Sequence, residues 1–593
     1  MNHPLLTYPF DPQLILKKRR AIRRELLASG GPWLDKKVAI LGGSTTHDIR
    51  EMLELFLLDQ GIRPTFYESE FGQYWEDATF GSPGLDALEP DVIFVHTSTR
   101  NILRWPAPGD GQAEAEALAE DTMSRLEAMW DKLADRWHCP VIQNNFELPH
   151  YRLMGNREAV DWGGRVAFVH RLNARMAEYA RTHSSFYVND LMYLAADFGL
   201  SRWADPLYWH MYKYCLCLSA IPALAFSVSN LIKAIYGRNR KALALDLDNT
   251  LWGGVVGDDG VEGIVVGHET SMGQVYSEFQ GYLKELKGIG VVLNVDSKND
   301  LENALAGLNH PEGTLRPDDF ISIQANWQPK DQNLRAMADQ LSLTPDAFVF
   351  VDDNPAERAI VAAQVPGAAV PEMGKPEDYL RVLDRSGFFE VVDLSADDLK
   401  RNEMYRANAQ RARLEASFAS YDDYLRSLEM TAVIRDFEPV YLARITQLTN
   451  KSNQFNLTTR RYTEAEMEQA ASDPELIRLY GKLTDKFGDN GVITVVIGRQ
   501  EGETVHIQLW LMSCRVLKRN MEHAMLDALA AQALARGART LRGYYYKTAK
   551  NKMVEDFYAG FGFTLVERNG EDTVWELDLT GYQPQNHVIK VVD

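Results

Sequence analysis

The sequence predicts a multidomain α/β fold, in which two domains with parallel sheets are followed by a smaller α+β domain. Short apolar runs bounded by turn residues alternate with helical segments along the first two-thirds of the chain, which is typical of buried parallel strands. After residue 431, alternating strands are mixed with amphipathic helices. The chain has 593 residues, 45% hydrophobic and 25% charged, so it is long enough for about two to four globular domains.

Four regions differ in pattern, and we expect them to be separate parts of the fold: 1–235, 236–385, 386–430 and 431–593. The first begins with a basic helical segment, and the third is polar and helical, as a linking segment would be. The expected strands of the other three regions are 38–41, 91–95, 241–247, 290–296, 347–352, 491–498 and 504–513.

Charge and cysteine content exclude several classes of protein. The net charge of −20 argues against a general nucleic-acid binder, although a local basic patch would still suit an acidic carrier protein. The spacing of the four cysteines fits neither a zinc ribbon nor a disulfide framework. We find no secretory apolar region and no apolar run of about 18 residues, so we expect a cytoplasmic protein without membrane contact.

The segment 243–254 is an apolar strand that ends in Asp246 and Asp248, followed by Thr250 and a glycine-rich turn. Strand alternation places both carboxylates on one face. Two carboxylates at a strand end, where backbone amides become free, suit a hard cation such as Mg²⁺. One carboxylate can attack phosphorus while the metal neutralises the phosphoryl oxygens. The segment therefore predicts phosphoryl chemistry.

Three further polar groups follow later predicted strands in order: Ser297, then Lys330, then the pair Asp352 and Asp353. Open α/β sheets bind ligands at the carboxyl ends of their strands, where these groups lie. With the Asp-x-Asp-x-Thr segment, they resemble the four motifs of the haloacid-dehalogenase (HAD) phosphotransferases. The extension Asn-Thr-Leu-Trp-Gly-Gly after Asp248 resembles the FkbH-like branch of that superfamily.

The resemblance implies a HAD Rossmann-like domain with a role for each motif. Asp246 would be the nucleophile and Asp248 the general acid/base, while Ser297 binds a phosphoryl oxygen and Lys330 offsets phosphate charge. Mg²⁺ would be held by Asp246, Asp248 through its backbone carbonyl, and Asp352 or Asp353. The further residues expected to bind phosphate are Asn249, Thr250, Trp252, Gly253, Gly254, Lys298 and Asn299.

The last region extends the FkbH-like resemblance through segments 448–462, 485–491 and 511–516. Segment 550–563 resembles the end of a GNAT-type acyltransferase fold, which implies a GNAT-like α+β domain. GNAT folds hold the pantetheine arm of coenzyme A between splayed strands and its pyrophosphate on a glycine-containing loop. Lys518 stands where that loop has glycine, so coenzyme A binding is in doubt. Arg515 and Lys518 are instead expected to bind the single phosphate of a carrier's phosphopantetheine.

Cys514 follows an apolar strand and lies beside Arg515. A neighbouring cation lowers a thiol pKa, so Cys514 is our candidate acyl relay, with an inert buried cysteine as the alternative. At the strand end before Ser297, where some relatives carry cysteine, this chain has Asp296.

The first region carries a Gly-Gly-Ser turn at Ser44 after an apolar strand. It resembles the first block of the SGNH hydrolases, with Gly43 in place of their aspartate, and implies a flavodoxin-type α/β domain. Asn101 is a candidate oxyanion donor. Asp205 and His210 resemble the late block, with a longer spacer. Two readings stay open: an active Ser44/His210 esterase, or a degenerate scaffold or carrier-docking domain.

The whole pattern resembles the FkbH-like glyceryl-transferring enzymes of polyketide and related biosynthesis. The resemblance implies transfer of a glyceryl unit from 1,3-bisphosphoglycerate to the phosphopantetheine thiol of an acyl carrier protein, with loss of phosphate and a Cys514 thioester intermediate. Two alternatives remain. One is an Mg²⁺-dependent phosphatase with a non-catalytic GNAT-like module, and the other is a coenzyme A-dependent acyltransferase.

Overall fold

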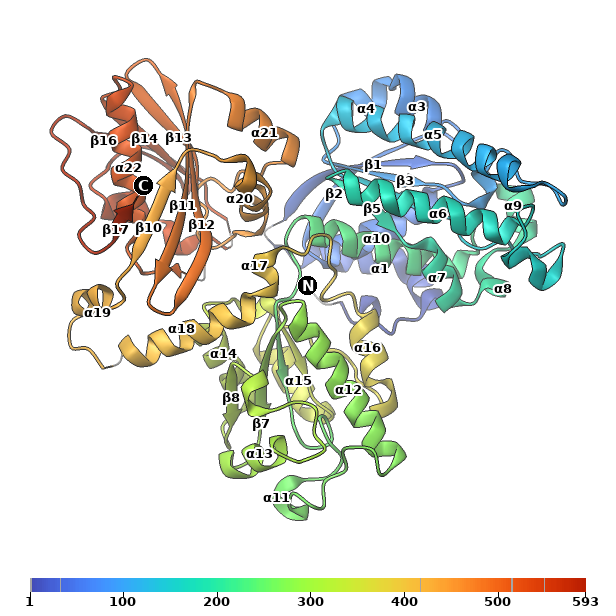
Figure 1. The fold of residues 1–593 in the computed structure, drawn as a ribbon, viewed down its shortest axis with the longest axis horizontal. Helices are drawn as coiled ribbons and strands as arrows, with labels where there is room; N and C mark the ends of the chain where they lie inside the picture. The colour runs from blue at the N-terminus through green and yellow to red at the C-terminus, as the bar shows by residue number, and fades with distance from the viewer. Residues whose placement is uncertain (1–2, 32, 416, 514–515, 549, 593) are drawn as a thin grey trace. The chain divides into compact units, whose positions relative to one another are not determined.

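The computed structural model describes residues 3–31, 33–415, 417–513, 516–548 and 550–592, without the side chains of Asp397 and Arg413. The chain divides into two compact units, Met1–Ile235 and Tyr236–Asp593 (Figure 1). Three sheets account for their cores, one in the first unit and two in the second.

The first unit is built on a parallel sheet with the strand order β2-β1-β3-β4-β5. Its strands are β1 (Leu34–Gly42), β2 (Ile62–Glu68), β3 (Val92–His96), β4 (Val141–Asn144) and β5 (Phe186–Asn189). This is the order of flavodoxin-like doubly wound folds, so the predicted flavodoxin-type domain is confirmed. The order reverses between β1 and β3, which makes their carboxyl ends the expected place for a ligand.

Helices cover both faces of this sheet (Figure 1). One face carries α1 (Pro12–Ala28), α2 (His47–Asp59) and α10 (Ile221–Ile235), and the other α3 (Tyr74–Phe80), α5 (Gln112–Trp137) and α6 (Arg165–Thr182). Shorter helices complete the unit: α4 (Pro83–Leu88), α7 (Leu191–Phe198), α8 (Leu200–Trp203) and α9 (Pro206–Tyr212).

Helix α10 corrects one expectation, because the segment Leu218–Ile235 is long and apolar enough to cross a membrane. The segment is 67% buried within the structure, and α10 packs along α2. Leu224, Val228 and Ile232 on α10 are fully buried. A helix that is apolar almost all round and buried in this way is a core helix of the unit.

The second unit begins with a four-stranded parallel sheet of order β8-β7-β6-β9. Its strands are β6 (Ala242–Leu245), β7 (Val292–Ser297), β8 (Ser322–Ala325) and β9 (Phe348–Val351). Helices α12 (Ser271–Gly288), α13 (Leu301–Leu308) and α16 (Tyr379–Arg385) cover one face, and α14 (Lys330–Gln340) and α15 (Pro355–Gln364) the other. A single turn of helix, α11 (Val256–Asp259), follows the glycine-rich turn after β6.

A helical segment connects this sheet to the last one, through α17 (Ala396–Leu399), α18 (Arg401–Glu415) and α19 (Tyr421–Ser427). At one end, Asn402 Nδ2 donates to the carbonyl oxygens of Lys287 and Val291 at 3.0 and 3.1 Å. At the other end, the Arg411 guanidinium forms two hydrogen bonds to Asp485, at 2.9 and 2.6 Å. Both polar side chains are buried, so α18 is fixed at both ends.

The last sheet has the order β15-β16-β14-β13-β12-β11-β10-β17 and is antiparallel except for the pairs β13–β14 and β10–β17. Its strands are β10 (Thr431–Arg435), β11 (Leu476–Asp485), β12 (Gly488–Glu501), β13 (Thr504–Met512), β14 (Thr540–Tyr545), β15 (Thr564–Asn569), β16 (Asp572–Asp578) and β17 (Lys590–Val592). Its helices are α20 (Pro439–Lys451), α21 (Glu464–Ser472), α22 (Met521–Ala535) and α23 (Phe557–Gly560).

Helix α22 connects β13 to its parallel neighbour β14. The two strands pair only from Thr504 to Ile507, opposite Thr540 to Gly543, and β13 continues without β14 as far as Met512. A mixed sheet that opens between two parallel strands joined by a helix is the GNAT-like α+β arrangement predicted from the sequence.

Candidate metal centre

Three carboxylates meet at the carboxyl edge of the β6–β9 pair. Asp246 directly follows β6, and Asp352 and Asp353 directly follow β9. The parallel register places Leu245 opposite Val351, so the residues after them are neighbours. One oxygen from each of the three carboxylates lies within 4.8 Å of the others, which gives a divalent cation three oxygen ligands.

Lys330, the first residue of α14, lies beside two of these carboxylates. Its Nζ is 2.9 Å from Asp246 and 2.5 Å from Asp352, and all three side chains are buried. Burial raises the pKa of both Asp246 and Asp352, and the charge of Lys330 opposes that rise. Burial also raises the pKa of Asp353, and Asp352 adds to the effect. Three carboxylates facing one ammonium leave an excess of negative charge, so the residues fit Mg²⁺.

Asp248 lies outside this group of three, and its carboxylate has other partners. Oδ1 accepts hydrogen bonds from Trp252 Nε1 and the Val256 amide at 2.9 and 3.0 Å, and Oδ2 accepts one from Asn299 Nδ2 at 3.0 Å. Its side chain is therefore held by the loop after β6, and only its backbone carbonyl remains a candidate metal ligand. Three donors fix the orientation that a general acid/base at this position needs.

Ser297 ends β7 next to β6, and its hydroxyl is hydrogen-bonded to Asp246, which lowers the pKa of that carboxyl. The neighbouring Lys298 is exposed and pairs with Glu357 at 2.6 Å. The structure therefore brings Ser297 to the carboxylate group and directs Lys298 to helix α15.

Most of the residues expected to bind phosphate in the turn after β6 instead hold the turn together. Asn249 Oδ1 accepts from the Gly254 amide at 3.0 Å, and the Gly253 amide donates to Val265 at 3.0 Å. Thr250 is fully buried, and its Oγ1 accepts from the Asp353 amide at 3.2 Å. Trp252 is buried, with its Nε1 on Asp248. These contacts orient the two acidic segments, and phosphate binding by these residues stays a prediction.

Arg358 on α15 is a residue that sequence reasoning missed. Its Nη1 donates to the backbone carbonyl oxygens of Asp352 and Asp353, both at 2.8 Å, and its Nη2 to Glu372 at 2.7 Å. It thereby fixes the loop that carries two of the three carboxylates. Its place five residues after Asp353, in the first turns of a helix, was the only sequence signal.

Asp296 is buried beside this site on β7. Asn333 Nδ2 donates to its Oδ1 at 3.0 Å, while among the described residues its Oδ2 has no partner. Burial raises the pKa of Asp296 to about 8. At neutral pH this position therefore holds a neutral carboxylic acid.

In the first unit, Ser44 follows β1 at the point where the strand order reverses. Its hydroxyl donates to Cys215 Sγ at 3.3 Å, and Cys215 Sγ lies 3.3 Å from His96 Nε2. His96 Nδ1 is 2.8 Å from Asn144 Nδ2. All four side chains are buried, and burial raises the pKa of Cys215 to about 12 and lowers that of His96 to about 4. The result is a neutral buried network.

The hydrogen bonds of a Ser44, Asp205 and His210 triad are not formed among the described residues, which favours the scaffold or carrier-docking reading of this domain. Asp205 caps α9 by accepting hydrogen bonds from the amides of Leu207 and Tyr208 at 2.9 and 3.4 Å, and the side chain of His210 is exposed. Among the described residues, no hydrogen bond links Ser44, Asp205 and His210. Asn101 does reach the turn, because its Nδ2 donates to the Gly43 carbonyl at 2.9 Å.

The expected acyl-transfer residues of the last domain are only partly described. Cys514 and Arg515 lie outside the described residues. Lys518 is exposed with a φ of +63°. The neighbouring Arg519 is buried and donates to Asp485 at 3.1 Å and to Asn408 at 2.6 Å. The Arg519 guanidinium is therefore hydrogen-bonded to partners inside the protein.

The opening between β13 and β14 is filled by the chain itself. Beyond their paired residues, the Leu457 amide donates to the Trp510 carbonyl at 3.0 Å, and the Met512 amide donates to the Phe455 carbonyl at 3.0 Å. On the other side, the Tyr546 amide donates to the Leu457 carbonyl at 2.9 Å. Segment 455–457 therefore lies between the two strands, where GNAT folds hold pantetheine.

Residues 37–233 match the model of the FkbH N-terminal domain family. This range contains all of the sheet of the first unit except the first three residues of β1, and it includes Ser44 and His96. It also supports the resemblance to the FkbH-like family that was drawn from the motifs of the second unit.

Solved structures are similar to parts of this chain. The N-terminal part of a Bacteroides fragilis protein, described as containing a phosphatase domain complexed with Mg, is 28% identical, with a TM-score of 0.58, over 64% of this chain and 99% of that chain. An Escherichia coli ribosomal-protein alanine N-acetyltransferase is 12% identical over 25% of this chain and 94% of that chain, with a TM-score of 0.21. No curated protein sequence matches the chain.

Proposed function

We propose that this chain is an Mg²⁺-dependent HAD-type phosphatase whose reaction takes place at Asp246. The observation that carries the proposal is the convergence of Asp246, Asp352 and Asp353 beside the buried ammonium of Lys330. The similar Bacteroides fragilis structure contains a phosphatase domain complexed with Mg, which supports the choice of metal. When bound, Mg²⁺ supplies positive charge opposite the phosphoryl oxygens.

The side chains of the site carry out nucleophilic attack, proton transfer and charge stabilisation. An Asp246 oxygen attacks phosphorus, the bond from phosphorus to the leaving oxygen breaks, and the phosphoryl group is carried on Asp246 until water removes it. Asp248 is held in position to give a proton to the leaving group and to take one from the attacking water. Lys330 balances the charge on the transferred group, and Ser297 donates a hydrogen bond at the same edge.

We further propose that the substrate is an acyl phosphate, 1,3-bisphosphoglycerate, and that the glyceryl unit passes to the phosphopantetheine thiol of an acyl carrier protein. The FkbH-domain match in the first unit and the FkbH-like segments of the second support this assignment. In that reaction the Cys514 thiol attacks the acyl carbon, the acyl carbon–oxygen bond breaks with release of inorganic phosphate, and the thiol proton goes to solvent. The remaining phosphate ester of the bound unit is removed by the Asp246 chemistry with water. The glyceryl group then passes to the carrier thiol, whose proton returns to Cys514. Cys514 is the proposed carrier of the glyceryl group between donor and acceptor.

Intact-mass spectrometry tests both levels of the proposal. The full chain, Mg²⁺, freshly made 1,3-bisphosphoglycerate and a phosphopantetheinylated carrier are incubated together, and phosphate is measured in parallel. A glyceryl increment on the carrier that requires both Asp246 and Cys514 is expected for the transferase. Phosphate release that is lost in Asp246→Asn but unaffected in Cys514→Ala, with no increment on several carriers, would leave the phosphatase alone. Enzyme-dependent phosphate release in Asp246→Asn that equals that of the wild type contradicts both.

The filled opening between β13 and β14 speaks against a pantetheine arm at that place, whether it belongs to coenzyme A or to a carrier protein. The coenzyme A-dependent alternative depends on that place, whereas the proposed transfer does not. Segment 455–457 takes the backbone partners that a pantetheine arm would need along β13. We therefore expect no transfer from acetyl-coenzyme A, measured as free thiol released in the presence of amine and alcohol acceptors.

A further inference from the structure

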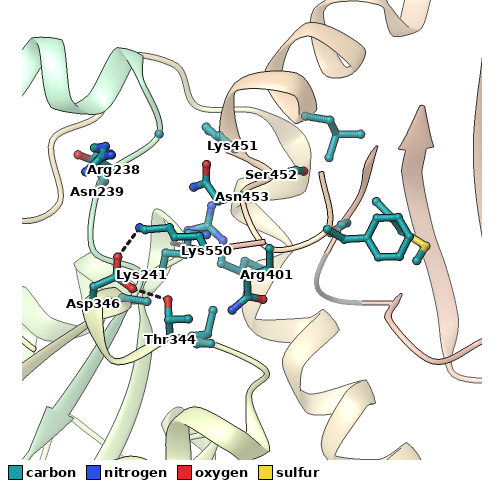
Figure 2. Close-up of a pocket in the computed structure, with 18 of the residues that line it drawn as sticks. Arg238, Asn239, Lys241, Thr344, Asp346, Arg401, Lys451, Ser452, Asn453 and Lys550 are labelled. Atoms are coloured by element: carbon teal, nitrogen blue, oxygen red, sulfur yellow. Dashed lines mark hydrogen bonds and ion pairs between the residues drawn. The ribbon is translucent and has the colours of Figure 1, made fainter. Parts of the chain in front are cut away.

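The second unit contains a cavity of about 900 Å³, including its open mouth, between the four-stranded sheet, helix α18 and the last domain. Figure 2 shows Lys550 reaching into this cavity toward Asp346, with Thr344 on the other side of the same carboxylate. Lys241 and Asn239 come from the chain before β6, and Lys451 to Asn453 from the end of α20 (Figure 2). Four separate segments thus contribute polar side chains to one space.

The cavity is strongly cationic. Asp346 is the one acidic residue among its described lining residues, whereas six lining residues are basic: Arg238, Lys241, Arg401, Arg444, Lys451 and Lys550. Asp398, behind the lining, pairs with Arg401 and with Lys451. The described lining is therefore richer in basic than in acidic side chains, in a protein whose net charge is −20.

Two basic side chains at and beside the cavity have lowered pKa values. Burial lowers the pKa of Lys451, and the charge of Arg401 adds to the shift, against the opposite pull of Asp398. Burial and the charge of Arg238 lower the pKa of the neighbouring Arg461 to about 10. Like charges that depress each other in a half-buried space are relieved by a bound anion.

This cavity is separate from the metal centre. Lys241 directly precedes β6 and Asp346 lies just before β9, so the cavity lies at the amino edge of the sheet. Asp246 and Asp352 follow the same two strands at the carboxyl edge. A four-residue strand spans about 13 Å, which separates the two places.

The geometry points to a second ligand site in this cavity, one that binds an organic phosphate. Its basic side chains suit a phosphate dianion, and Ser452, Asn453 and Ser513 add hydrogen-bonding groups. Leu343, Leu448, Phe455 and Met512 also line it. This apolar wall suits an organic body attached to the phosphate. Binding here is independent of the chemistry proposed at Asp246.

Isothermal titration calorimetry of the full chain in EDTA tests this site with two probes, 4′-phosphopantetheine and adenosine 5′-diphosphate. The probe that binds more tightly identifies the source of the phosphate. Arg444→Ala and Lys550→Ala, in segments far apart in the sequence, are each expected to weaken binding by about tenfold. Asp346→Asn is expected to tighten binding several-fold, because it removes the acidic lining residue. A variant that merely disturbed the fold would not tighten it.

Two controls locate the binding. Lys132→Ala removes an exposed lysine of α5 and should bind the probe as the wild type does. Asp246→Asn should also bind it unchanged, because the metal centre is at the other edge of the sheet. The inference is overturned if neither probe binds, if Asp246→Asn loses the binding, or if Arg444→Ala and Lys550→Ala keep it. Phosphate release is not the readout, so failure here leaves the proposed phosphatase untouched.

Discussion

Arg358 shows how a single side chain determines the geometry of the metal centre without facing the substrate. It anchors the backbone of Asp352 and Asp353 through two hydrogen bonds of 2.8 Å. Groups that orient metal ligands commonly change metal affinity by about 10- to 100-fold when removed. Loss of a positioning residue of this kind is expected to weaken metal binding more than it lowers the rate of turnover.

We expect Arg358→Ala to raise the Mg²⁺ concentration needed for half-maximal phosphate release by about tenfold or more, with a smaller change in rate at saturating Mg²⁺. Arg335→Ala is the matched control, since Arg335 is an exposed arginine on α14 that contacts the Gln364 carbonyl. Equal Mg²⁺ dependence of Arg358→Ala and wild type contradicts the role.

Asp296 predicts a dependence of stability on pH. Its folded pKa of about 8 lies above the ordinary carboxyl value, so the folded state holds a proton that the unfolded state releases. The resulting cost is absent below pH about 4, grows as pH rises, and is complete above about 8. Asp296→Asn should therefore stabilise the metal-free protein most at pH 8 to 9, with a gain that vanishes toward pH 4. Thermal melting across that range measures it, and a gain independent of pH contradicts the assignment.

Among single residues, the sequence best predicted the site residues that directly follow a strand. Asp246, Ser297, Asp352 and Asp353 were found because each follows an apolar run, and Lys330 because its segment resembles a HAD motif. The structure brings them together. The buried network of Ser44 was not found. Cys215 is 119 residues from His96 in the chain, and no local pattern connects them.

At the scale of elements, the seven expected strands correspond to β1, β3, β6, β7, β9, β12 and β13, and the other strands were not predicted. Strand β8 reads Ser-Ile-Gln-Ala and has two half-buried residues, so it lacks the continuous apolar run that revealed β6 and β9. Helix α18 was predicted as a linking helix, but its anchoring was not. The pair of Arg411 and Asp485 depends on a contact 74 residues away along the chain.

That anchor gives a testable prediction. Asp485 is buried and faces both Arg411 and Arg519, at 2.6 and 3.1 Å. Asp485→Asn removes one charge and leaves two buried guanidinium groups, so we expect a loss of about 3–5 kcal/mol in the free energy of unfolding. Glu468→Gln, at an exposed position on α21, should change it by less than about 0.5 kcal/mol. Chemical denaturation, followed through the unfolding transition of the second unit, measures the free energy of unfolding of both variants. Similar losses in the two variants would exclude a special role for Asp485.

The whole molecule is two compact units, each with its own buried core. All residues proposed for phosphatase chemistry lie in the second unit. We therefore expect a fragment of residues 236–593 to release phosphate from a small phosphate ester at a rate within a few-fold of the full chain. A folded fragment with no activity, judged by circular dichroism and phosphate assay together, would assign the first unit a part in the reaction.

Segment 455–457 changes how the sheet of the last domain would respond to a cofactor. A sheet that opens between two strands leaves amides and carbonyls that a cofactor can satisfy, and such a domain tightens when the cofactor arrives. Here a permanent stretch of the same polypeptide satisfies them. The domain is complete as soon as it folds. Coenzyme A would therefore add no backbone hydrogen bonds in this opening. A ligand of this domain would bind instead at its loops or in the cavity at its border.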